Sequence, residues 1–151
     1  MSAGKALVDT NVLVYAYDCS EPEKQKRALE ILDTLAETDA GVLSAQVLSE
    51  FFVTITRKIT SPLSVAEAYE RIKNYATMWT ILDVTELVVL EAARGVRDHQ
   101  LSFWDAEIWA TARLNQIPLV LSEDFQSGAI IEGVRFLNPL LPAFDIHSIM
   151  A

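Results

Sequence analysis

Short apolar segments that alternate with longer amphipathic ones constrain the fold of this chain most strongly. The sequence predicts strands over residues 5–8, 42–44, 80–83, 119–121 and 134–137. Apolar residues at helical spacing predict helices over residues 12–17, 21–39, 45–58, 64–78, 85–98 and 103–116. Short buried strands separated by helices are typical of a parallel sheet that is covered on both faces. We therefore expect an α/β fold, a three-layer α/β/α sandwich with a parallel central sheet.

Two consecutive helices, 45–58 and 64–78, interrupt this alternation because no strand separates them. Ser64 and Glu67 have the spacing of a capping box, which predicts the start of the second helix. We therefore expect an inserted helical pair. Its aromatic residues suit an arm or a subunit interface, or simply the core. They are Phe51, Phe52, Tyr69 and Tyr75.

The first strand runs directly into an acid-hydroxyl-amide triplet, Asp9-Thr10-Asn11. In open α/β sheets the carboxyl end of a strand faces the ligand crevice, so a carboxylate there is placed for chemistry. Alternatively, Asp9 or Thr10 only caps the helix that follows. Acids at equivalent places elsewhere in the chain would favour the first interpretation.

The size and composition of the chain set further limits. Its 151 residues match a single domain, which we expect to span residues 1–151. Charged residues interrupt the apolar runs too early for a membrane span, and no signal sequence is recognisable, so we expect a cytoplasmic protein. Cys19 is the only cysteine, which excludes an internal disulfide and a multi-cysteine metal site.

The formal net charge of −9 argues against a protein that coats nucleic acid through long-range attraction. It does not exclude an enzyme that acts on nucleic acid. If part of the negative charge is a compact carboxylate cluster, bound divalent ions would invert the local charge and attract phosphate.

Four carboxylates stand out by their positions near strand ends and helix starts. Each has an ordinary explanation, because acids suit helix N-termini, turns and polar helix faces. In a parallel sheet, however, these positions gather at one edge, which predicts a shared pocket. The four are Asp9, Glu50, Asp105 and Asp124.

A cluster of like charges requires neutralisation, and hard divalent cations with oxygen ligands provide it. The two histidines, His99 and His147, are far apart in the sequence and form no histidine pair. An all-carboxylate site favours Mg²⁺ or Mn²⁺ over zinc. Such ions activate water and stabilise the charge that develops during phosphodiester hydrolysis.

Four motifs in this order closely resemble PIN-domain proteins, particularly the VapC-type toxins of bacterial toxin–antitoxin pairs. The resemblance extends from Leu7 to about Pro139, and the order and spacing of the motifs make it specific. The motifs are Val8-Asp9-Thr10-Asn11, Ser49-Glu50-Phe51-Phe52, Ser102-Phe103-Trp104-Asp105-Ala106 and Leu121-Ser122-Glu123-Asp124-Phe125.

The resemblance implies a metal-dependent endoribonuclease that cuts RNA in single-stranded or loop regions. Asn11 and Ser122 match polar positions that support the acids in the family. The resemblance also implies a cognate antitoxin that holds the protein inactive, and a homodimer. The residues that would hold Mg²⁺ or Mn²⁺ are Asp9, Glu50, Asp105 and Asp124.

Positive partners for the RNA backbone are less distinct. Arg57 and Lys58, or Arg94 and Arg97, are candidates, although solvated surface charge explains each of them equally.

Two further acids lie beside the proposed ligands. Glu107 is two helical residues beyond Asp105, about 200° around the axis, and we expect it outside the ligand set. Glu123 should face away from Asp124 in an extended segment.

Other classes of protein fit less well. A dehalogenase-type phosphatase requires an Asp where Asn11 stands, and a signalling receiver requires a lysine that is absent after Asp83. A catalytically inactive PIN-like module that binds RNA or protein is the stronger alternative. The retention of all four acids argues against it.

Overall fold

A mostly parallel sheet forms the centre of the computed structural model, which describes residues 4–149. The strands are β1 (Ala6–Val8), β2 (Gly41–Ser44), β3 (Thr80–Leu82), β4 (Leu119–Leu121), β5 (Ile130–Ile131) and β6 (Val134–Leu137). Their order across the sheet is β3-β2-β1-β4-β6-β5. The first strand, β1, is therefore central, and it is buried along its whole length.

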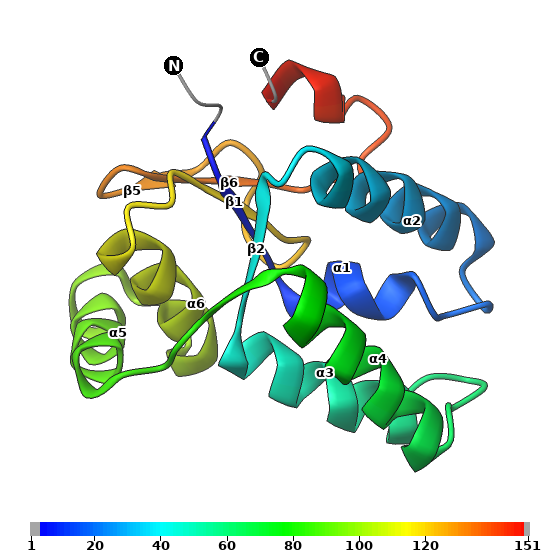
Figure 1. Cartoon of the computed structure of the whole chain (residues 1–151). Helices are drawn as coiled ribbons and strands as arrows, with labels where there is room; N and C mark the ends of the chain where they lie inside the picture. Colours follow the sequence, from blue (N-terminus) through cyan, green and yellow to red (C-terminus); the bar gives the residue numbers. More distant parts are fainter. Residues whose placement is uncertain (1–3, 150–151) are drawn as a thin grey trace.

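The helices follow the predicted segments with ends that differ by a few residues. They are α1 (Thr10–Tyr15), α2 (Pro22–Glu37), α3 (Ala45–Arg57), α4 (Val65–Met78), α5 (Glu86–His99), α6 (Phe103–Leu114) and the 3₁₀ helix η1 (Ile146–Ile149). Figure 1 shows α5 and α6 on one side of the sheet and α2 on the other. This arrangement confirms the predicted α/β/α fold. Between residues 4 and 149, no helix has both the length and the apolar character that crossing a membrane requires.

The predicted helical pair is present as α3 and α4, which lie side by side in Figure 1. The capping box at Ser64 and Glu67 is formed as predicted. Phe51 is fully buried and meets the ring of Tyr75 edge-on at 5.7 Å, so these two aromatics belong to the core. Tyr69 is exposed, and it is free to serve an arm or an interface.

One edge of the sheet differs from the prediction. The sequence predicts five parallel strands, whereas the structure adds β5, which pairs antiparallel with β6. A two-residue turn joins them, in which Glu132 and Gly133 both have positive φ angles of 46° and 84°. Two residues are too few to show the alternation that identifies a strand from sequence. The four-residue 3₁₀ helix η1 was not predicted either.

The parallel pairing of β1 with β4 positions the functional residues. Val8 lies opposite Leu121, so the residues that follow the two strands emerge next to each other. The backbone N–H of Asp9 extends this pairing by donating to the carbonyl of Leu121 at 2.9 Å. Asp9 and Ser122 are thereby brought together although 113 residues separate them.

Gly95 allows α5 and α6 to pack closely. A Cβ atom at this position would lie 2.7 Å and 2.9 Å from two ring carbons of Trp109. Trp109 is fully buried, so its ring cannot move away without disturbing the core.

We predict that Gly95→Ala destabilises the protein by about 1–3 kcal/mol, because overpacking outweighs the usual gain from alanine in a helix. Urea denaturation measures the free energy of unfolding. Ala93→Gly on the exposed face of α5 is the control for helix propensity, with an expected cost of about 1 kcal/mol. A stabilising Gly95→Ala would show that the close contact is unimportant.

Candidate functional site

The Asp9 carboxylate lies at the end of β1 and is only 4% exposed. Its Oδ1 accepts a hydrogen bond from the backbone N–H of Thr10 at 2.7 Å, and its Oδ2 accepts one from the Ser122 hydroxyl at 2.7 Å. Asp9 is also the N-cap residue of α1. The two interpretations of the sequence are therefore compatible, since one oxygen serves the helix and the other faces the strand-end site.

The side chain of Asn11 connects three of the predicted residues. Its Nδ2 lies 3.1 Å from Ser122 Oγ, 3.1 Å from Asp124 Oδ2 and 3.5 Å from Asp9 Oδ2. Its Oδ1 accepts a hydrogen bond from the backbone N–H of Glu123 at 3.3 Å. One amide thus holds the loop after β4 against the start of α1 and fixes the spacing of the Asp9 and Asp124 carboxylates.

Glu50 and Asp105 come from two different helices. Glu50 on α3 accepts hydrogen bonds from Thr10 Oγ1 at 3.1 Å and from Gln46 Nε2 at 2.8 Å. Asp105 lies in the first turn of α6, where the N-cap Ser102 accepts a hydrogen bond from its backbone N–H at 3.4 Å.

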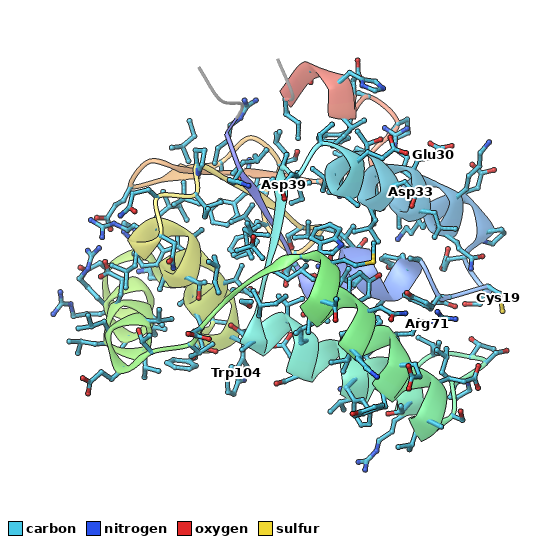
Figure 2. The ribbon with its side chains drawn as sticks, viewed as in Figure 1. Cys19, Glu30, Asp33, Asp39, Arg71 and Trp104 are labelled. Carbon is cyan, nitrogen blue, oxygen red and sulfur yellow. The ribbon has the colours of Figure 1, made fainter. Side chains whose placement is uncertain are left out.

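A cavity of about 760 Å³ opens over these residues. Glu50, Asp105 and Asp124 line the cavity. Asp9 lies close enough to Glu50 and Asp124 for their charges to raise its pKa. Apolar side chains complete the wall, and Trp104 among them is labelled in Figure 2 near the first turn of α3. The structure thus brings the four predicted acids to one site from four separate segments.

Burial and the charges of neighbouring acids oppose ionisation of Asp9 and Asp105. Desolvation raises the pKa of Asp9 to about 7, although hydrogen bonds from Ser122 and Thr10 lower it. Desolvation likewise raises the pKa of Asp105, and the charges of Asp124 and Glu50 raise it further. A cation in the cavity would relieve these costs.

The donor set fits a hydrated divalent ion. Between residues 4 and 149, no three His, Cys, Asp or Glu side chains converge tightly on one metal position. Mg²⁺ retains several of its waters and needs only one or two direct carboxylates, so a wide acidic cavity suits it. The oxygen-only donors exclude a zinc site of the Cys/His type.

The predicted basic residues separate into two groups. Lys58 lines the cavity, whereas Arg57 at the end of α3 does not. Arg94 and Arg97 lie on α5 outside the cavity, and both form ion pairs with Asp98.

The sequence analysis missed Gln46 and the contacts that Glu123 makes. Gln46 supports Glu50 from four residues earlier on α3, a spacing that could have indicated it. Glu123 faces Tyr15, whose hydroxyl donates to it at 2.7 Å, and Lys24, whose Nζ lies 3.4 Å away. These contacts anchor the loop that carries Asp124. Glu107 lines the same cavity, and its expected place outside the ligand set stays a prediction.

The fold and its acids define an α/β protein with an acidic pocket near the carboxyl ends of its central strands. The sequence model of the family described as PIN domain matches residues 6–127, more than half of the chain. The chain therefore belongs to the PIN-domain family. A search of curated proteins finds no match.

Solved structures with similar folds come from bacterial toxin–antitoxin systems. A toxin–antitoxin complex from Klebsiella pneumoniae has 18% identity and a TM-score of 0.65, covering 89% of this chain and 98% of that one. VapC20 of Mycobacterium tuberculosis, described as a Sarcin-Ricin loop cleaving toxin, has 18% identity and a TM-score of 0.58, covering 80% and 90%. DNA-bound VapBC from Salmonella typhimurium has 16% identity and a TM-score of 0.61, covering 90% and 97%.

The raised pKa of Asp9 predicts how stability depends on pH. The ordinary pKa is 3.8 and the folded one about 7, so the folded state holds an extra proton between these values. In metal-free protein, the free energy of unfolding should therefore fall as pH rises from about 4 to about 7. Asp9→Asn should remove most of this fall and be more stable than the parent at pH 8 by a few kcal/mol.

Urea denaturation in EDTA across this pH range tests the prediction. Asp33→Asn, an exposed position on α2, should retain the parental pH dependence. An Asp9→Asn protein with an unchanged slope would contradict it.

Proposed function

We propose that this protein is a metal-dependent endoribonuclease and the toxin of a toxin–antitoxin pair. The convergence of four acids from separate segments on one cavity carries this proposal. Membership of the PIN-domain family and the similarity to VapC-type folds support it. An acidic pocket that gains positive charge with a divalent ion suits a phosphodiester substrate.

Each polar residue has a definite role in the proposal. Asp9, Glu50, Asp105 and Asp124 would hold Mg²⁺ or Mn²⁺, which would activate water and stabilise developing phosphate charge. Asn11 and Ser122 would fix the orientation of Asp9 and Asp124 through the hydrogen bonds described above. Removing such supporting contacts typically lowers metal affinity or activity by about 10–100-fold. We expect a loss of about this size for Asn11→Ala.

Lys58 is the basic residue best placed to meet the RNA backbone, because it is exposed and lines the cavity. Arg57 precedes Lys58 as the last residue of α3 and would contact more distant phosphates. Arg94 and Arg97 would reach the RNA only outside the cavity, and their ion pairs with Asp98 compete with phosphate.

We predict that the purified protein cuts total cellular RNA into discrete fragments with Mn²⁺ or Mg²⁺, and that EDTA abolishes cleavage. Asp9→Asn should reduce cleavage at least about 100-fold, since it removes a charged group at the centre of the acid cluster. Gel electrophoresis of the RNA is the measurement. Asp33→Asn removes the same charge on α2, far from the cavity lining, and should cleave like the parent (Figure 2).

Full activity of Asp9→Asn would remove this residue from the mechanism. RNA binding without cleavage by the folded, metal-loaded protein would favour a non-catalytic PIN-like module instead.

The partners of the chain are part of the same proposal. An antitoxin would cover the acidic cavity and present a Lys or Arg side chain to Glu50, Asp105 and Asp124. The exposed apolar residues Leu87 and Leu90 on α5 favour a homodimer. We further infer one PIN-like domain over residues 1–151, because β6 lies beyond the matched residues yet joins the same sheet. Its RNA substrate and its antitoxin would both be met in the cytoplasm.

We predict that light scattering of the protein at high concentration gives twice the mass of one chain. Addition of the product of the neighbouring gene should give a larger complex in which RNA cleavage is lost. A monomer would contradict the homodimer, and a neighbouring gene product that neither binds nor inhibits would contradict the antitoxin.

A further inference from the structure

The cavity has a part that the proposed metal ligands do not use. Its wall includes the indole of Trp104, which is 63% exposed and offers a large flat apolar face. The ring of Phe103 packs edge-on against it, with the two ring centroids 5.2 Å apart. Val53 and Val84 add apolar surface to the same wall. An exposed aromatic face of this kind suits the stacking of an unpaired nucleobase.

Two residues with hydrogen-bond acceptors, Glu107 and Gln46, lie in the lining of the same cavity. Glu107 is only 5% exposed, and its carboxylate forms no hydrogen bond with any residue in the described part of the chain. Gln46 Oε1 is also buried without a partner among residues 4–149, because the Gln46 amide group donates to Glu50 and to the Trp104 carbonyl. Leaving the buried Gln46 Oε1 unpaired is costly, so a ligand with N–H donors would compensate it, and the Glu107 carboxylate in the same lining offers further acceptor oxygens.

The helical spacing places one acceptor beside the aromatic face. Glu107 follows Trp104 by three residues on α6, so both side chains lie on the same side of the helix. A base stacked on the indole would therefore share the cavity with the Glu107 carboxylate.

The acceptors distinguish between the bases. Guanine has two adjacent donors, N1–H and N2–H, on its Watson–Crick edge, and a carboxylate accepts both at once. Adenine and cytosine present a single amino group there. Uracil presents one N–H between two carbonyl oxygens. These oxygens are themselves acceptors, so they would repel the acceptors of the cavity.

We propose that this cavity binds an unpaired guanine of the RNA, with Trp104 against the ring and with Glu107 and Gln46 Oε1 accepting hydrogen bonds from its Watson–Crick edge. Lys58 on the same cavity lining would meet the attached phosphate. The inference rests on the proposed action on RNA, and it names the base that the site selects.

Tryptophan fluorescence of the full chain in Mg²⁺, titrated with 5′-GMP, 5′-IMP, 5′-AMP and 5′-UMP, tests the proposal. GMP should quench the fluorescence saturably and bind at least about fivefold more tightly than UMP. IMP lacks the N2 amino group and should bind with intermediate affinity.

Two variants and one control variant show which residues contact the base. Trp104→Phe should lose the quenching signal, whereas Trp79→Phe, a partly buried tryptophan outside the cavity lining, should retain it. Glu107→Gln should still bind and be quenched, with the preference for GMP over UMP reduced to about onefold, because glutamine offers one acceptor in place of two. Thermal unfolding confirms that each variant is folded.

The outcomes separate this inference from the proposed nuclease activity. Mononucleotides contain no internucleotide bond, so their binding does not require cleavage. Equal affinity for all nucleotides, or no quenching that depends on Trp104, would overturn the guanine site even if RNA is cut. A Trp104 signal produced by the neighbouring gene product and by no nucleotide would assign the cavity to a protein partner instead.

Discussion

The parallel pairing of β1 with β4 is the contact on which the candidate site depends. It brings the ends of the two strands together, so that Ser122 reaches the Asp9 carboxylate at 2.7 Å. Asn11 then extends this contact to Asp124. The acid cluster is thus a consequence of strand register, because a shift of one residue would turn these side chains to the opposite face.

Carboxylates in two parts of the molecule differ in whether basic side chains neutralise them. Around α5 and β5, Glu91 and Glu132 are neutralised within the chain by Arg94 and Arg113, at distances of 2.5–3.6 Å. The carboxylates at the cavity have no comparable partner among the described residues. Burial of Asp9 therefore costs stability in the absence of a ligand, an arrangement that is typical of functional sites. The negative charge there is available for a cation.

The sequence was informative where short-range patterns determine structure. Apolar runs predicted the strands that matter for the site, and the rule for strand ends predicted that Asp9 and Asp124 would meet. Contacts between side chains from distant segments, such as Glu123 with Lys24 or Gln46 with the Trp104 carbonyl, leave no pattern in sequence. The orientation of Glu107 toward the cavity likewise depends on how α6 packs, which helical spacing alone does not determine.

An acidic chain can act on RNA if its affinity for RNA does not come mainly from contacts with the phosphate backbone. With a net charge of −9 and Lys58 as the basic residue in the cavity lining, long-range phosphate attraction is weak. In the proposed function, RNA binding would then draw on a divalent ion at the acids and on contacts with the bases. Base contacts carry sequence information, whereas phosphate contacts do not. An acidic nuclease of this construction would therefore act on few RNA sites, and an exposed Trp104 beside hydrogen-bond acceptors provides the surface with which to select them.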